Sequence, residues 1–492
     1  MKKIISTVAA LGLVAGFAAS ASAMDFSMTG KYVLEGYMLN NADGAEKSNV
    51  SASTANGGFD PYSDEAGTDS AWVQTFLVKP TLKVNDKITM ISEIRFAKDS
   101  DWGSQDDLMA YNHDSSSRDL DIYHIYMEYM SPVGKLRMGR TPAGSWGSDF
   151  LSTASTANRF MWWPSFVAEP FSLCIFTQKS TEGDWYDGDS DSDNDLYEID
   201  LTYKVDNMNL RVAYDYFNYK GSSDIAGTVK TPASITYVDG TPDTISYTPA
   251  VNYTKDEQYD RQNHRLKANA DMKFGDISVL GEWGWQFGKW MEYDTETVGV
   301  REDRDVDAMA AMLDVSYKMD KLDVGMMYFW AEGQDKRTSS TDDEDVTAAM
   351  AGTLDDGIGD DFNPYYILTG DHTGMLNSDE YNDDSNMATG GVSCIGLHTD
   401  FAVSDQLSLH GALAYAWADD TAEVERLSGI NSVDDDYGWE VDLGAKYKLL
   451  DNLTYELRGA YFNTGDFFDD LNGTTTDVDD LYLVSHHLTM TF

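Results

Sequence analysis

A short turn recurs along the chain, and it constrains the fold more than any other feature. Five copies combine a lysine, then Asn, Asp or Gly residues, then an apolar residue: "LKVNDKIT", "YKVDNMNL", "MKFGDISV", "YKMDKLDV" and "YKLLDNLT". "FAVSDQLS" and "MSPVGKLR" are looser versions, which brings the number of short connections to seven. Asn, Asp and Gly tolerate the positive φ of tight hairpin turns. The sequence therefore predicts a series of β-hairpins.

Apolar and polar residues alternate on both sides of these turns. After Asn207 the apolar series is Met208, Leu210, Val212, Tyr214 and Tyr216, and it alternates with Asn209, Arg211 and Asp215. Before Gly275 the apolar series is Leu266, Ala268, Ala270 and Met272, and it alternates with Arg265, Lys267, Asn269 and Asp271. A period of two indicates strands with one apolar face. Segments of about ten residues match a tilted strand that crosses a bilayer.

The other ends of the predicted hairpins are joined by long acidic links, at 40–70, 99–118, 219–260, 333–390 and 419–436. Open sheets of this many strands are unusual in soluble proteins. In lipid every backbone group must be paired, and only closure removes the sheet edges. We therefore expect an all-β fold, a closed antiparallel transmembrane β-barrel with short periplasmic turns and long extracellular loops.

The pattern allows sixteen or eighteen strands. The first strand, the last strand and seven hairpins make sixteen, and "NRFMWWPSF" with "FSLCIFTQK" would add another hairpin, which favours eighteen. The first strand, "MDFSMTGKYVLEGYML", would pair with the last, "YLVSHHLTMTF". Phe492 would then lie at the membrane interface, where aromatic girdles occur.

Composition and the N-terminal residues add the compartment. Residues 1–23 combine Lys2 and Lys3, a short apolar run and Ala21-Ser22-Ala23, which is typical of a signal peptide cleaved after Ala23. Residues 24–492 would form one domain. The chain has 35 Lys and Arg against 84 Asp and Glu, a net charge of −49, which argues against nucleic-acid binding.

Other candidate sites are weaker. Carboxylates alternate at Asp187, Asp189, Asp191, Asp193 and Asp195, a pattern that hard cations such as Ca²⁺ prefer, although the spacing of a Ca²⁺ loop is incomplete. No cofactor is expected apart from such loop-bound divalent cations. Cys174 and Cys394 are too few for a disulfide scaffold, and their pairing stays open. No spacing marks a hydrolase, so we do not expect an enzyme.

The chain resembles the trimeric porins of Gram-negative outer membranes, and among them the homotrimeric porins of sulfate-reducing bacteria. "MTGKYVLEGYML" is similar to the porin first strand, and "PVGKLRMGRTPAG" is similar to the strand that leads into the inward-folded loop. The terminal Phe492, with Met490 and Leu488 at alternate positions, resembles the assembly signal read by the barrel-assembly machinery.

The resemblance implies a constriction at an inward loop within residues 141–170. It implies basic residues at Lys31 and Arg140, opposed by Asp149 and Glu169, with Arg95 and Arg159 as further basic candidates. Strict alternation, however, puts Arg140 on the face of Leu136 and Met138. Its side chain then reaches the lumen only if Gly139 forms a bulge.

The expected function is a passive outer-membrane channel for small hydrophilic solutes and ions. One alternative is a channel selective for an oxyanion or a sugar, and another is a structural or adhesive barrel with a plugged lumen. The resemblance implies a homotrimer, and the acidic loops would meet lipopolysaccharide through divalent cations.

Overall fold

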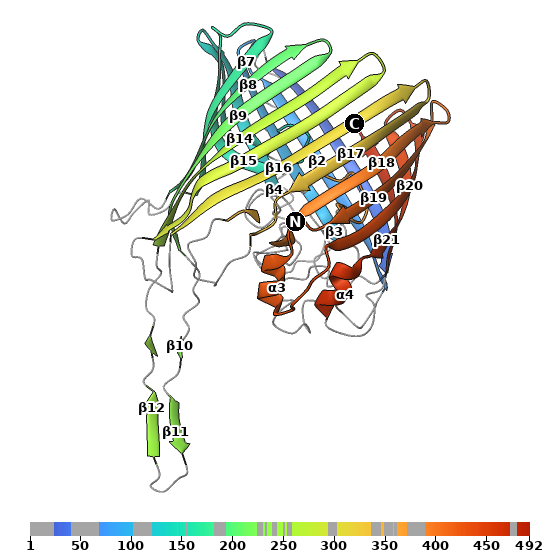
Figure 1. Cartoon of the computed structure of the whole chain (residues 1–492). Helices are drawn as coiled ribbons and strands as arrows, with labels where there is room; N and C mark the ends of the chain where they lie inside the picture. Colours follow the sequence, from blue (N-terminus) through green and yellow to red (C-terminus); the bar gives the residue numbers. More distant parts are fainter. Residues whose placement is uncertain are drawn as a thin grey trace, which may run out of the picture.

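The computed structural model describes the chain in several stretches. These are residues 24–40, 68–101, 121–144, 146–152, 155–181, 193–223, 230–231, 234–238, 244–248, 251–252, 258–293, 303–335, 346–348, 358, 362–370, 389–472 and 480–492. The predicted signal peptide, residues 1–23, lies outside them. Eighteen antiparallel strands form one sheet, and its first and last strands pair with each other. The expected closed barrel of eighteen strands is confirmed (Figure 1).

The barrel strands follow one another in chain order. They are β1 (Asp25–Asn40), β2 (Thr68–Lys83), β3 (Ile88–Asp101), β4 (Asp121–Ser131), β5 (Gly134–Ala143), β6 (Ser155–Pro164), β7 (Phe171–Thr181), β8 (Asn194–Val205), β9 (Met208–Ser223), β14 (Gln258–Phe274), β15 (Ile277–Tyr293), β16 (Arg304–Met319), β17 (Leu322–Ala331), β18 (Val392–Ala402), β19 (Leu407–Trp417), β20 (Asp436–Leu450), β21 (Leu453–Thr464) and β22 (Leu481–Thr491).

The closing seam joins β1 to β22. Lys31 is opposite Thr491 and Asn40 is opposite Tyr482, with the pairs between them in continuous register. Beyond the ladder, Gly30 N–H donates to the Phe492 carbonyl at 2.8 Å and Phe492 N–H donates to the Gly30 carbonyl at 3.1 Å. A Cβ at Gly30 would overlap the Phe492 ring, so the glycine makes room for it. The predicted pairing of the first and last strands is confirmed.

All seven predicted turns connect neighbouring strands at one end of the barrel. The eighth connection, residues 165–170, joins β6 to β7 and is the additional hairpin that favoured eighteen strands. The other end carries the long links, with α3 (Ala422–Ser428), α4 (Asp466–Asn472) and two small ladders, β10 (Lys230–Thr231) with β13 (Val251–Asn252) and β11 (Ser234–Val238) with β12 (Thr244–Thr248) (Figure 1). In the described part of the chain, no helix has the length and apolarity needed to cross a bilayer.

Alternation in the strands separates an apolar outer face from a charged inner face. Large apolar side chains such as Leu443, Ile199 and Leu413 are 69%, 50% and 48% exposed, whereas Lys267 and Asp215 are 3% and 0% exposed. A soluble protein has the opposite arrangement, with charges outside and apolar groups buried. The barrel wall therefore has the polarity of a protein that lipid surrounds.

Two inward segments occupy part of the lumen. The first, residues 146–152, follows β5, and we call it the constriction segment. The second, residues 362–370, belongs to the link between β17 and β18, and we call it the second inward segment. Phe150 of the first contacts Phe362 of the second, with ring centroids 5.1 Å apart. Both belong to one apolar cluster with inward residues of the wall, among them Phe329.

Glu332 follows β17 directly and lies at the long-loop end. Its carboxylate accepts a hydrogen bond from the Met309 N–H at 2.9 Å. Burial raises the pKa of this carboxyl from its ordinary 4.5 to about 7, and the neighbouring charges of Asp419, Asp335 and Asp307 raise it further. The folded protein therefore holds this proton more tightly than the unfolded chain does.

We expect this proton to make the barrel more stable in mild acid. The contribution is complete below about pH 4.5 and is lost as the pH rises through about 7, because the ionised carboxylate is then buried among acids. Thermal unfolding in detergent should begin at a lower temperature near pH 8 than near pH 5, and Glu332→Gln should reduce the difference. Asp86→Asn, in an exposed turn, is the control. An unchanged pH slope in Glu332→Gln would contradict this assignment.

Candidate functional site

The constriction segment is attached to the opposite wall through Glu282 of β15. Glu282 accepts hydrogen bonds from the Ser148 N–H at 2.6 Å, the Ser148 hydroxyl at 2.8 Å and the Leu151 N–H at 3.1 Å. Asn269 of β14 donates to the same carboxylate at 3.1 Å. Gly147 has φ +67°, and a Cβ there would overlap the Glu282 carboxylate. One buried glutamate thus fixes a segment more than 130 residues away in the sequence.

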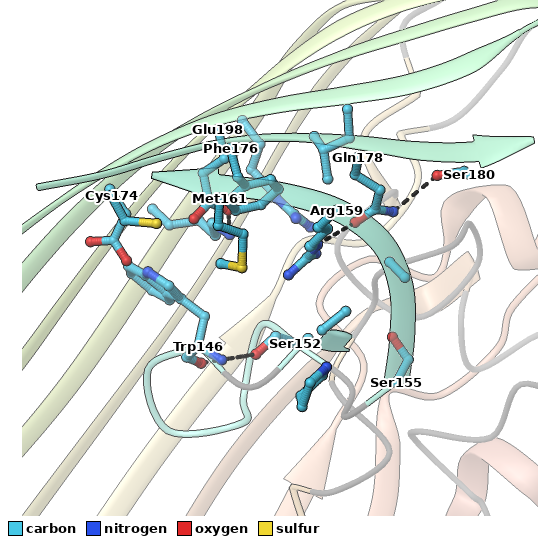
Figure 2. A pocket seen from close by; sticks show the side chains of 18 of the residues that line it. Trp146, Ser152, Ser155, Arg159, Met161, Cys174, Phe176, Gln178, Ser180 and Glu198 are labelled. Carbon is cyan, nitrogen blue, oxygen red and sulfur yellow. Dashed lines mark hydrogen bonds and ion pairs between the residues drawn. The ribbon is translucent and has the colours of Figure 1, made fainter. Parts of the chain in front are cut away.

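A cavity of about 670 Å³ lies between this segment and the wall formed by β5 to β9 and β14. Figure 2 shows Trp146 and Ser152 of the constriction segment facing the strands that carry Met161, Cys174 and Phe176. The main-chain N–H of Trp146 donates to the Ser152 hydroxyl at 3.1 Å, so the two ends of the segment are hydrogen-bonded to each other. We call this cavity compartment one.

Compartment one is lined by five cationic side chains and two carboxylates. The cations are Arg137, Arg159, Arg211, Arg265 and Lys267, and the carboxylates are Glu198 and Asp200. A third acid, Asp215, lies on the inner face of β9 and is fully buried between Lys267 and Arg265. In a chain with a net charge of −49, this lining has the opposite sign. The lining therefore carries an excess of positive charge.

The cations are held in place by neighbours on adjacent strands. Lys267 contacts Asp215 at 2.9 Å and Glu198 at 3.3 Å, and Arg265 contacts Asp215 at 2.9 Å. Arg211 pairs with Asp200. Because these groups are buried in pairs, their positions are rigid, and breaking one pair leaves an uncompensated charge.

Aromatic rings complete the cationic lining. The Arg211 guanidinium and the Lys267 ammonium lie 5.0 and 4.9 Å from the centre of the Trp146 ring. The Arg159 guanidinium lies 4.2 Å from the Phe176 ring and donates to the Gln178 side chain at 2.7 Å (Figure 2). Rings of this kind hold a cation in position without neutralising its charge. The rings therefore add no negative charge to the lining.

The structure places the predicted candidates at different sites. Arg159 lines compartment one. Lys31 and Arg95 lie on the inner face of β1 and β3, where Arg95 pairs with Glu93 at 2.9 Å. Asp149 belongs to the constriction segment, with φ +66°. Glu169 lies in the turn between β6 and β7, at the short-turn end, because β6 already begins at Ser155, within the expected 141–170.

Arg140 lies on the outer face of β5 and not at a constriction. It is opposite Ile125 of β4, in a register that runs without a shift from Ile125 to Ser131. No bulge occurs at Gly139, so alternation alone decides the direction, and Arg137 takes the inward position. Arg140 donates to the Thr156 hydroxyl at 2.9 Å and is exposed.

The remaining candidates are settled only in part. Asp193 and Asp195 both pair with Lys179, whereas Asp187, Asp189 and Asp191 lie outside the described residues. Among the described residues, no group of three or more His, Cys, Asp or Glu side chains is arranged to hold a metal ion. Cys174 and Cys394 are both free and buried, so they do not pair.

Four cations of compartment one were missed at the level of sequence. Arg211, Arg265 and Lys267 stand on the polar faces that alternation had identified, and Arg137 precedes Gly139 in the motif that resembles porins. The signal was therefore present in the period of two. The alternation predicts which residues point inward, but it does not predict which of them face the constriction segment across the lumen.

The fold and this site define a closed barrel with a cation-lined lumen. Among solved structures, the chain is similar to Pseudomonas aeruginosa OpdQ (13% identity, TM-score 0.48, covering 94% of this chain and 97% of that one). It is also similar to Pseudomonas aeruginosa OccK11 (OpdR), with 10% identity and a TM-score of 0.46, over 94% of this chain and 95% of that one. A third similar structure is an anion-selective porin from Comamonas acidovorans, with 10% identity and a TM-score of 0.41, over 95% of this chain and 100% of that one. No protein-family model matches the chain, and no curated protein matches it. Likenesses this distant do not establish a family, and the barrel rests on its own strand pairing.

We expect Glu282→Ala to release the constriction segment. The Ser148 and Leu151 amides would lose their charged acceptor, and each such bond contributes about 1.5–3 kcal/mol. Hydrogen exchange of the peptide that contains residues 146–152, followed by mass spectrometry, should become at least about tenfold faster. Glu292→Gln, on the same strand and exposed, is the control. Unchanged exchange in Glu282→Ala would show that other contacts hold the segment.

Proposed function

We propose that the chain is an outer-membrane porin, a passive channel for small hydrophilic solutes and ions with a preference for anions. Compartment one, with its five cationic side chains against two carboxylates, is the observation that carries the proposal. A barrel of eighteen strands is wide enough to leave an aqueous lumen even when loops fold into it. The apolar outer wall fits a bilayer, and the long-loop end would face outside.

Anion preference follows from where the charges lie. Charges on exposed loops are screened within about 8 Å at physiological salt. The lining of compartment one is enclosed by a wall of low dielectric, so salt screens its charges less. The lumen cations therefore outweigh the acidic loops at moderate salt, although the chain as a whole is strongly acidic.

The same compartment also favours the narrower alternative, a channel selective for an oxyanion. Rigid arginines flanked by Trp146 and Phe176 resemble a binding site more than a plain water-filled opening. Single-channel recordings in planar bilayers separate the three functions. Ohmic steps indicate a general porin, block by a low concentration of one anion indicates a selective channel, and silence indicates a plugged structural barrel.

Arg159 and Arg140 form a matched pair for a test of ion preference. They lie on adjacent strands, Arg159 inside compartment one and Arg140 on the outer face. Arg159→Gln should move the reversal potential in a salt gradient toward cations, because it removes one lumen charge. Arg140→Gln should leave the reversal potential unchanged. A shift in both variants, or in neither, would contradict the assignment of the anion path to compartment one.

Homotrimer assembly is part of the proposal, and it rests on the resemblance stated above. Light scattering of the protein in mild, unheated detergent should give three times the mass of one chain. A species with the mass of one chain under those conditions would end this part of the proposal. Contacts with lipopolysaccharide and the barrel-assembly machinery are expected from the same resemblance.

A further inference from the structure

The second inward segment is held in the lumen by contacts with five neighbouring strands, β17 to β21. Its main chain is held by two acids of β20. The Ile367 and Leu368 N–H groups donate to the two oxygens of Glu440, both at 2.7 Å, and the Tyr366 N–H donates to Asp442 at 3.2 Å. Both carboxyls are 1% exposed. This carboxylate clamp repeats the arrangement at Glu282, on a different part of the wall.

Two glycines of the wall receive the tyrosines of the segment. A Cβ at Gly396 of β18 would overlap the Tyr365 hydroxyl, and a Cβ at Gly444 of β20 would lie 2.6 Å from the Tyr366 hydroxyl. The Arg458 guanidinium of β21 lies 5.0 Å from the Tyr366 ring. The Tyr365 hydroxyl is buried without a hydrogen-bond partner among the described residues. The segment is therefore closely packed against the wall, but one of its buried hydroxyl groups lacks a hydrogen-bond partner among the described residues.

A second cavity of about 370 Å³ lies against this segment, and we call it compartment two. It is lined by the segment itself and by inward residues of β16 to β21. Its charged lining consists of three carboxylates and two cations, namely Asp314, Asp400, Glu456, Lys446 and Arg458. His398 and His410 are paired with Asp314 and Asp400 at 3.0 and 3.1 Å. With both histidines neutral, compartment two therefore has one more carboxylate than cations, whereas compartment one has more cations than carboxylates.

We propose that compartment two belongs to a second solute path, which takes cations and which the second inward segment closes as a displaceable plug. The inference rests on the proposed channel function. When the segment moves away, Glu440 and Asp442 lose the hydrogen bonds that they accept from its main-chain N–H groups. Carboxyls in water ionise well below neutral pH. The open path would then be lined by five carboxylates against two cations, which favours cations.

Gly396→Ala tests the plug without removing a charge. The added methyl group pushes Tyr365 out of its place and leaves Glu440 and Asp442 intact. Gly459→Ala is the control, because at that strand glycine the nearest atom to a Cβ is 3.9 Å away. Single-channel conductance of Gly396→Ala in potassium chloride should rise, because a second water-filled path would open beside compartment one. Its reversal potential should move toward cations relative to the wild type.

The native Cys394 reports on the plug independently of conductance. It is fully buried on the inner face of β18 and belongs to the same apolar cluster as Tyr365. A charged methanethiosulfonate reagent should label it in Gly396→Ala and not in the wild type, and peptide mass mapping distinguishes it from Cys174. Labelling of Cys394 still reports whether the second inward segment has moved if the wild-type protein shows no conductance in bilayers. It therefore distinguishes an error in the proposed plug from an error in the proposed channel function.

Tyr366→Ala is the second variant, because it removes contacts with Arg458 instead of crowding the wall and should give the same changes more weakly. If the folded variants had wild-type conductance and an unlabelled Cys394, the proposal that the second inward segment is a displaceable plug would be overturned. A larger conductance with no shift toward cations would overturn the second path as a cation path. In both variants, heat-modifiable migration on gels confirms that the barrel has formed.

Discussion

Closure of the sheet is the constraint on which every other part of this protein depends. The seam between β1 and β22 pairs two strands that would otherwise present open edges, and Gly30 extends it to Phe492. Each backbone group left unpaired in hydrocarbon costs several kcal/mol. Gly36 also makes room on this seam, since a Cβ there would lie 2.5 Å from the His486 ring. Small residues let rings cover the seam from outside, so the join is packed as well as hydrogen-bonded.

Closure also creates an interior in which charges must be paired. Lys267 and Arg265 lie inside the wall at 3% and 5% side-chain exposure, and Asp215 between them has none. Loss of one partner from such a buried group costs about 3–5 kcal/mol. Charges of this kind are therefore fixed parts of the wall, and they determine the electrostatic potential inside the barrel. The partition of the lumen into one compartment rich in cations and one rich in carboxylates follows from which strands carry them.

The barrel was predictable from the sequence because its determinants are local. The turn after Val205 and the alternation after Met208 each need only a few neighbouring residues, and closure then follows from the need to pair every edge. The same alternation correctly argues against Arg140, which the motif resemblance had favoured for the lumen. The inward segments were not predictable in this way. The Ser148–Glu282 and Ile367–Glu440 bonds join residues 134 and 73 positions apart, and no local pattern marks Glu282 or Glu440 as an acceptor for main-chain N–H groups.

The two inward segments are held by the same kind of contact. The constriction segment donates three hydrogen bonds to Glu282, and the second inward segment donates three to Glu440 and Asp442. Each also keeps one buried polar group without a hydrogen-bond partner among the described residues, the Trp146 indole N–H and the Tyr365 hydroxyl. The difference lies in the walls against which the segments pack, since compartment one has more cations than carboxylates and compartment two has more carboxylates than cations. Displacement of one segment would therefore change the charge of the open lumen in the opposite direction to displacement of the other.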